Sequence, residues 1–290
     1  MNDANNAILV IGSLHHDIML DAEHLPRTGE TVAGSRWYTK FGGKGGNQAI
    51  AAARAGSCVR MVSAVGRDAF AKPLLETLDT AGVDRRWVTE FADVSSGMSV
   101  AISNSDGDYG AVIVSGANLN IDASVLDDDQ LWNNIGLLCL QNEISESLNV
   151  AAAGLAKSRS IPVCLNAAPA RMLPDALLDC VEILVVNEIE LSMLCNDDDV
   201  SSIENICAAA RKLALRVPTV LVTLGDRGVV LQSKDSDTNH IEAMKVSVKS
   251  THGAGDVFIG ELCAALTRGK DIEVAVKIAN TAAGRHVAGR

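Results

Sequence analysis

Short apolar runs alternate with helical stretches along most of the chain, and this alternation is what most constrains its fold. Each run has the length and continuous apolar character of a strand buried on both faces. Repeated strand and helix units predict a three-layer α/β/α sandwich with a mostly parallel central sheet. The apolar runs are residues 7–12, 59–65, 136–140, 161–165, 183–186 and 219–223, and the helical stretches are 49–55, 71–81, 145–157, 189–194 and 203–215.

Two segments depart from this alternation, and their patterns indicate sheet without helices. They are residues 14–41 and residues 97–114. In the second segment, strand-like runs at 98–103 and 109–114 flank an Asn, Ser, Asp and Gly turn at 104–108, which predicts a hairpin. No Pro-rich or Ser-rich linker divides the chain, so we expect all 290 residues to form one domain that contains both segments.

The composition indicates a globular, acidic protein. Hydrophobic residues make up 48% of the 290 residues, which is ample for a buried core. The formal net charge of −11 argues against a nucleic-acid partner, because such a partner needs clustered Lys and Arg. No apolar stretch reaches the roughly 18 residues of a membrane span, so we expect no membrane partner. Seven scattered Cys without Cys-x-x-Cys spacing are typical of reduced core residues, so we expect a cytoplasmic location.

The most informative local motif spans residues 251–260, where a turn of small residues leads into an apolar helix. Gly253, Ala254 and Gly255 leave their backbone N–H groups open to an anion, and the positive end of the helix adds to the attraction. Asp256 follows in the first helical turn, within reach of a group that attacks a bound phosphate. Taken alone, the motif also fits a plain tight turn in which Asp256 caps the helix.

A second glycine-rich segment lies much earlier in the chain. Residues 42–46 comprise four glycines and a lysine, and an Ala-rich helical run follows as far as Gly56. We expect a loop whose backbone can touch a ligand. The segment does not match the Gly-x-x-x-x-Gly-Lys-Ser/Thr pattern of a Walker A loop, and it lacks the Gly-x-Gly-x-x-Gly spacing of a dinucleotide site.

Together, the two segments resemble the two sequence motifs of the ribokinase-like (PfkB) carbohydrate kinase family. The resemblance implies ATP-dependent transfer of the γ-phosphate to an alcohol, with Mg²⁺. It also implies that residues 14–41 and 97–114 form a small β-sheet lid over the sugar, which often pairs with the lid of a second subunit in a homodimer. Further stretches that resemble the family are residues 26–31, 115–118, 140–143, 166–170, 187–190 and 223–228.

The resemblance implies a role for each matching residue. Asp256 is the expected catalytic base, and the N–H groups of Gly253, Ala254 and Gly255 are expected to stabilise the transferred phosphoryl group. Glu190 is expected to help to hold Mg²⁺ through water. The residues implied to bind the sugar are His15, Asp17, Gly42, Gly43, Lys44, Asn47 and Glu143. Those implied to bind the nucleotide are Asn187, Thr223, Gly225, Gly228 and Asn280.

Three departures from the family pattern bear on the substrate and on ion activation. His15 stands where Asn is usual, which alters the set of groups that binds hydroxyls, unless this His is incidental. Ser250 replaces an Asp, with Lys249 before it, and the sequence stops at Arg290 where relatives continue. A monovalent cation site beside the anion-binding turn is therefore doubtful, and we expect K⁺ to matter little. Glu143 could also be a solvated residue at a strand end.

The expected function is phosphorylation of a hydroxymethyl group of a pentose such as ribose, or of a related sugar. One alternative keeps the mechanism and changes the acceptor to a nucleoside, with His15 stacking on the base. Another alternative is a sugar-binding protein with weak catalysis, suggested by Ser250 and by the C-terminal end at Arg290. The complete motif from Gly253 to Asp256 argues against that alternative.

Overall fold

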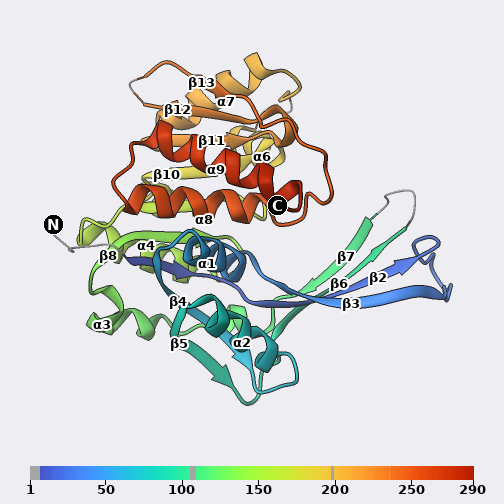
Figure 1. Cartoon of the computed structure of the whole chain (residues 1–290). Helices are drawn as coiled ribbons and strands as arrows, with labels where there is room; N and C mark the ends of the chain where they lie inside the picture. The colour runs from blue at the N-terminus through green and yellow to red at the C-terminus, as the bar shows by residue number, and fades with distance from the viewer. Residues whose placement is uncertain (1–6, 105–108, 197–198, 235) are drawn as a thin grey trace.

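The computed structural model describes residues 7–104, 109–196, 199–234 and 236–290, which fold around a large twisted sheet (Figure 1). Among these residues the sheet has nine strands in the order β13, β12, β11, β10, β9, β8, β1, β4, β5. The strands are β1 (Ala7–Ile11), β4 (Cys58–Gly66), β5 (Asp84–Phe91), β8 (Ile135–Gln141), β9 (Val163–Asn166), β10 (Ile183–Asn187), β11 (Thr219–Thr223), β12 (Val229–Ser233) and β13 (Asn239–Ile241).

The central strands of this sheet are parallel and apolar. All five residues of β1 are buried, and the strand pairs in parallel with β4 and β8. The strands β12 and β13 run antiparallel at one edge. A strand covered on both faces buries every side chain, which explains the unbroken apolar runs in the sequence. The predicted α/β/α architecture is confirmed.

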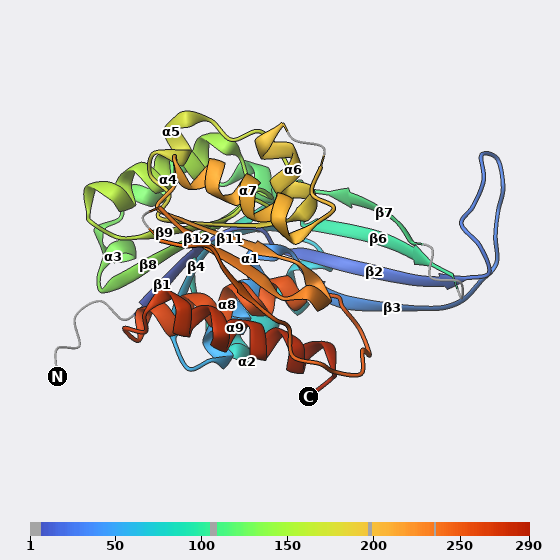
Figure 2. The same ribbon diagram turned by 90° about the horizontal axis from the view of Figure 1, so that it is seen from above.

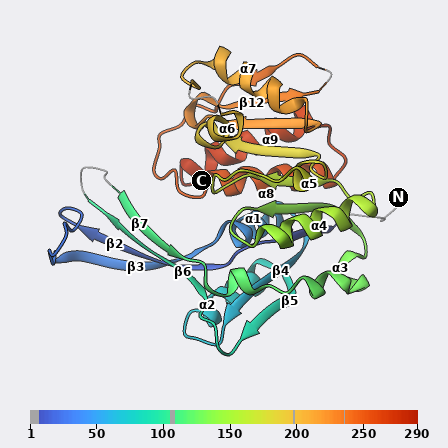
Figure 3. The same cartoon turned by 180° about the vertical axis from the view of Figure 1, so that it is seen from behind.

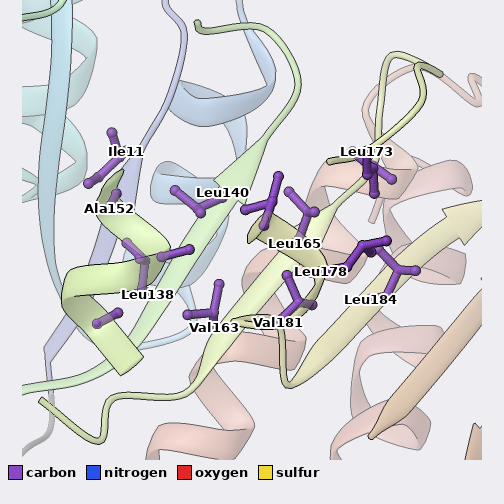
Figure 4. Close-up of a cluster of buried hydrophobic side chains, with 14 of the residues drawn as sticks. Ile11, Leu138, Leu140, Ala152, Val163, Leu165, Leu173, Leu178, Val181 and Leu184 are labelled. Carbon is purple, nitrogen blue, oxygen red and sulfur yellow. The ribbon is translucent and has the colours of Figure 1, made fainter. Parts of the chain in front are cut away.

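Helices cover both faces of the sheet, as Figure 2 shows. One buried cluster includes Leu138, Leu165 and Leu184, and Figure 4 shows it together with Ala152 of α4. Residues of α7 belong to the same cluster. The other cluster includes Ile8 and Met61 and packs beneath α1, α2, α8 and α9. The helices are α1 (Lys44–Arg54), α2 (Ala71–Ala81), α3 (Asp129–Trp132), α4 (Glu146–Ser158), α5 (Asp175–Leu178), α6 (Glu188–Cys195), α7 (Ile203–Ala214), α8 (Ala254–Thr267) and α9 (Ile272–Val287).

The two segments without helices form a second sheet, the lid sheet, which Figure 3 shows extending away from the first. Its described strands lie in the order β3 (Gly34–Gly42), β2 (His15–Ala22), β6 (Gly97–Ser103) and β7 (Tyr109–Val114). Strands β6 and β7 are antiparallel, as the predicted hairpin requires. Of the turn predicted at 104–108, residues 105–108 lie outside the described residues.

The structure also differs from the sequence predictions. The helix expected from residue 49 begins at Lys44, so the predicted glycine loop is wrong: its residues end β3 and start α1. The pattern did not predict β5, whose charged residues include paired Arg86 and Asp84, nor the short β13. Helix α9 was also missed, although Asp271 caps it by accepting from the Val274 N–H. Among the described residues, no helix is long and apolar enough to cross a bilayer.

Candidate active site

The start of α1 lies against the end of β1, and glycines make this contact possible. Gly43 has φ of 88°, a conformation that suits glycine, and it connects β3 to α1. A Cβ on Gly43 would lie 2.7 Å from the Ser13 carbonyl oxygen, and one on Gly45 would lie 2.6 Å from the Gly12 backbone. Close packing therefore demands small residues here and overrides their low helix propensity.

Glu143 is attached to this same helix start. Its Oε2 accepts from the Lys44 backbone N–H at 2.8 Å and from the Ser13 hydroxyl at 2.5 Å. A carboxylate at a helix N-terminus satisfies a free N–H group and interacts favourably with the helix dipole. The half-buried Glu143 therefore has a defined position at the end of β8, and is not simply a solvated strand end.

Asp256 lies in the first turn of α8, and its carboxylate contacts α1. Its Oδ2 accepts from Asn47 Nδ2 at 3.1 Å, and its Oδ1 accepts from Gln48 Nε2 at 3.0 Å. The N-cap of α8 is Gly253, with φ of 77° and no side-chain cap. Burial raises the pKa of Asp256, while the Lys44 charge and the hydrogen bonds from Gln48 and Asn47 oppose that rise. This arrangement suits a carboxylate that exchanges a proton.

The turn before Asp256 is open toward solvent. A Cβ added at Gly255 would meet no atom within 4 Å, and one at Gly253 would meet only His286, at 3.5 Å. Ala254 is the first residue of α8, so its N–H belongs to the free end of the helix. Asp256 also borders a cavity of about 420 Å³ between α1, α8 and α9. An anion can therefore approach this turn without displacing a side chain.

Asp17 and His15 occupy the inner end of the lid sheet. Both are buried, with exposed fractions of 8% and 3%, and they share one face of β2 because they are two residues apart. The Ser99 hydroxyl on β6 donates to Asp17 Oδ1 at 2.6 Å. A Cβ on Gly42 would lie 2.0 Å from Asp17 Oδ2, so Gly42 makes room for this carboxylate.

The surroundings of His15 are unusual for a buried side chain. It pairs with Gly42 on β3 and with Gly97 on β6, so neither cross-strand neighbour has a side chain beside it. Its Nε2 is buried and has no hydrogen-bond partner among the described residues. His16 faces the opposite side, as the alternation predicts, and stacks on Phe70 with ring centroids 4.5 Å apart. An unpaired buried nitrogen is costly, which favours a ligand or water contact at His15.

The predicted nucleotide residues gather at the ends of β10 and β11. Asn187 and Thr223 are directly paired across these strands. Asn187 caps α6 in a capping box, in which Glu190 accepts from the Asn187 N–H at 2.8 Å and returns its own N–H to the Asn187 side chain. Burial raises the pKa of Glu190, while the Asn187 hydrogen bond and the Lys44 charge oppose this rise.

Gly225, Gly228 and Asn280 complete this second group. Gly225 and Gly228 have φ of 60° and 92° in the turn after β11. A Cβ on Gly228 would lie 2.0 Å from the Ile241 carbonyl oxygen, and Asn280 Nδ2 donates to the neighbouring Glu242 carbonyl at 2.8 Å. Gly228 precedes β13 in the sequence and Asn280 follows it, and both contact the end of β13 or the residue directly after it.

Lys44 connects the two groups of residues. Its positive charge acts on both Asp256 and Glu190, so the ammonium group lies within electrostatic reach of both carboxylates. A cation in that place is suited to a bound polyphosphate. The lid end, the start of α1, the turn before α8 and the ends of β10 and β11 thus surround one region of the molecule.

The residues fit a magnesium ion held mainly by phosphates and water. Among the described residues, no group of three His, Cys, Asp or Glu side chains is placed to bind a metal directly. Glu190 Oε1 also accepts from Asn187 Nδ2, at 3.1 Å, so the carboxylate is held within its capping box. Mg²⁺ usually keeps several waters and takes few protein ligands at phosphate sites. Contact through water suits Glu190 better than direct ligation.

Three residues of this region were not among the sequence predictions. Ser13 and Ser99 orient Glu143 and Asp17, and Gln48 orients Asp256. Gln48 directly follows Asn47 in the glycine-rich motif, which is the one local clue to its role. Ser13 lies between β1 and β2, Ser99 lies in β6, and neither residue belongs to the two glycine-rich motifs.

Comparisons with known proteins identify the family of the chain. A model of the pfkB family carbohydrate kinases matches residues 5–288. The chain is 36% identical over 281 residues to a ribokinase of Bacillus subtilis, covering 97% of this chain and 92% of that relative. It is 32% identical over 286 residues to a deoxyribokinase of Salmonella typhimurium, covering 98% and 93%.

A solved structure of Arabidopsis thaliana ribokinase, complexed with ribose and ATP, has the same fold. It superposes with a TM-score of 0.90 at 33% identity, and the match covers 98% of this chain and 93% of the plant chain. The family match spans both motifs and every residue of the site. The chain therefore belongs to the pfkB family of carbohydrate kinases, and it is a phosphotransferase with an alcohol group as acceptor.

Proposed function

We propose that this kinase transfers the γ-phosphate of ATP to a hydroxymethyl group of a pentose such as ribose. The observation that carries the proposal is the Asp256 carboxylate, buried enough to raise its pKa and held by Asn47 and Gln48 beside the open turn before α8. A base in this position can accept the hydroxyl proton as the phosphoryl group is transferred. The relatives named as ribokinase and deoxyribokinase support a pentose acceptor.

The sugar would lie between the lid sheet and the start of α1. Asp17 and Glu143 offer carboxylate oxygens to sugar hydroxyls, and Lys44 and Asn47 offer donors. Gly42 makes room for the Asp17 carboxylate and Gly43 lets the start of α1 pack against Ser13, so both glycines would shape the wall of this pocket. His15 completes the set, and its unpartnered Nε2 supports a role in choosing the acceptor.

The nucleotide would lie across the ends of β10 and β11. Asn187, Thr223, Gly225, Gly228 and Asn280 border this side, and the N–H groups of Gly253, Ala254 and Gly255 would stabilise the phosphoryl group in transit. Bound Mg²⁺ would neutralise charge on the phosphates, with Glu190 orienting its waters. The weak dependence on K⁺ inferred from Ser250 stays a prediction.

A homodimer in the cytoplasm is the proposed form of the protein. Val112 and Val114, on one face of β7, are 69% and 49% exposed, and a second lid could cover this apolar strip. All seven Cys lie among the described residues and are free, which suits a reducing compartment.

Asp256→Asn tests the chemistry. We expect kcat to fall about 10²-fold or more, with sugar and ATP affinity nearly unchanged, because a base acts mainly in the transition state. Initial rates of ADP release and calorimetric titrations measure the two quantities.

Asp271→Asn is the matched control for that variant. Asp271 caps α9 through the Val274 N–H, and Asn caps almost as well, so kcat should stay close to the unmodified value. If Asp256→Asn behaves like this control, Asp256 is a structural residue and the proposed chemistry is wrong.

The acceptor requires a separate test, because a nucleoside is the second candidate. A base could stack on His15 only if the imidazole face were open, and its exposed fraction of 3% argues against this. ADP release should be measured with ribose, 2-deoxyribose, hexoses and nucleosides. A higher kcat/KM for a nucleoside than for any pentose would contradict the proposal, and no turnover with any acceptor would favour a sugar-binding protein.

A further inference from the structure

Gln48 lies directly behind the Asp256 carboxylate, in the second turn of α1. Its exposed fraction is 1%, and its amide has four partners. Nε2 donates to Asp256 Oδ1 at 3.0 Å and to Asn166 Oδ1 at 3.2 Å. Oε1 accepts from Gln141 Nε2 at 2.8 Å and from Cys139 Sγ at 3.3 Å. A carboxamide has two donor hydrogens and two acceptor lone pairs, so every one of them is used.

The partners fix which way this amide points. Asn166 turns its oxygen to Gln48 because its own Nδ2 donates to the Val185 carbonyl oxygen. Reversing the Gln48 amide would set its oxygen against the carboxylate oxygen of Asp256 and its nitrogen against the donor of Gln141. The network therefore runs in one direction, from the donors on β8 to Gln48, and from Gln48 to Asp256 and to Asn166 on β9.

Backbone packing holds α8 at the distance that this network needs. A Cβ on Gly260 would lie 2.7 Å from the Ala52 backbone nitrogen and 2.8 Å from the Gln48 carbonyl oxygen, so α8 meets α1 without an intervening side chain. The consecutive residues Asn47 and Gln48 then reach the two oxygens of the same carboxylate. Asn47 lines the cavity beside Asp256, whereas Gln48 is buried and does not line it.

We propose that Gln48 is a positioning residue that orients the Asp256 carboxylate toward the acceptor hydroxyl and stabilises its ionised form. The inference rests on the proposed function, since it assigns a second residue to the same proton transfer. Burial raises the pKa of Asp256, and the Gln48 hydrogen bond is one of the interactions that oppose this rise. Without that donor, the carboxylate should bind its proton more tightly and lose its fixed orientation.

Other charged groups face Asp256 from every neighbouring element, and they are unchanged by a substitution at Gln48. Lys44 favours the ionised carboxylate, whereas Glu143 disfavours it. The remaining ionisable groups lining the adjacent cavity are Arg54, His252, Glu261, Arg285, His286 and Arg290.

Gln48→Met is the primary test, because Met keeps the length of the side chain and removes its donor. We expect kcat to fall about tenfold or more with little change in sugar KM, as for loss of a hydrogen bond to a charged group. The acid limb of the kcat/KM profile should move about one pH unit upward, since the free enzyme must lose a proton from Asp256 before it can act as a base.

Gln232→Met is the matched control. Gln232 is 3% exposed on β12, and its Nε2 donates to two carbonyl oxygens, those of Ser233 and Ser236. Both variants remove a buried amide and should lower the melting temperature, but only Gln48→Met should move the pH profile. If the profile stays in place and kcat falls no more than in Gln232→Met, the positioning role is wrong.

Gln48→Glu serves as a second variant, in case Gln48→Met does not fold. It keeps the shape of the side chain and sets a second carboxyl group 3.0 Å from Asp256, so the pair should retain a proton and the acid limb should again move upward. An unchanged acid limb would overturn the inference. Failure of the proposed function has a different signature, because then Asp256→Asn itself would leave kcat unchanged.

Discussion

The two sheets of this molecule bury their side chains differently. In the central sheet, every residue of β1 is buried, and polar site residues occur where strands end. In the lid sheet, β2 alternates between buried and half-buried residues, and β3 is largely exposed. The lid nevertheless keeps His15, Asp17 and Ser99 buried on its inner face. The central sheet thus buries mainly apolar side chains, whereas the lid sheet buries polar groups, which suits the recognition role proposed for it.

The largest expected effect is a difference between the two sheets in how much a substitution lowers the free energy of unfolding. Leu138→Ala removes a fully buried side chain of β8 and should lower the free energy of unfolding by about 3 kcal/mol. Val112→Ala, on the exposed face of β7, should change it by less than about 0.5 kcal/mol. Urea denaturation measures both values. Equal losses of unfolding free energy would mean that the lid sheet contributes as much to stability as the central sheet.

A smaller effect concerns the inner face of the lid. Asp17→Ala should weaken sugar affinity about tenfold to a hundredfold, the scale of hydrogen bonds to a charged group, with little change in ATP affinity. Calorimetric titration with the preferred sugar measures this. Asp21→Ala, four residues along the same strand and half-buried, is the control and should bind sugar normally. Unchanged sugar affinity in Asp17→Ala would show that the inner face of the lid sheet is not part of the sugar pocket.

The smallest expected effect is a change in acceptor preference. His15→Asn replaces an imidazole with a shorter group that can both donate and accept, so the ratio of kcat/KM for ribose to that for other acceptors should rise several-fold, roughly the contribution of one hydrogen bond. His16→Asn, on the opposite face, should leave the ranking unchanged. The same ranking in a folded His15→Asn variant would make His15 incidental.

Much of the fold could be predicted because the central strands are apolar throughout. The edge strand β5 was not predicted, because Asp84, Arg85 and Arg86 interrupt its apolar pattern and form surface ion pairs. The start of α1 was not predicted for a different reason. Gly45 and Gly46 have low helix propensity. Only their close contacts with Gly12, Leu14 and Phe41 explain why glycines occupy this helical turn. Tertiary packing decided that boundary.

The candidate site was predictable where one motif holds several functional residues. Asp256 and the glycines before it are contiguous, and Lys44 and Asn47 lie within one turn of each other. The orienting contacts were not predictable. Gln48 meets Asp256 across 208 residues of sequence, and Ser99 meets Asp17 across 82. No local pattern encodes a hydrogen bond that forms only when two distant elements pack.

The one-residue connection at Gly43 bears on how each substrate affects the binding of the other. Strand β3 of the lid ends at Gly42, and α1 begins at Lys44, so a single residue separates the lid from the helix that holds Asp256. A tilt of the lid about Gly43 would move the first turn of α1. Lys44 lies in that turn, and its charge acts on the carboxylates of Asp256 and Glu190. If sugar binding drew the lid inward, the affinity for ATP would change, and thermodynamic reciprocity would require ATP to alter the affinity for sugar by the same factor.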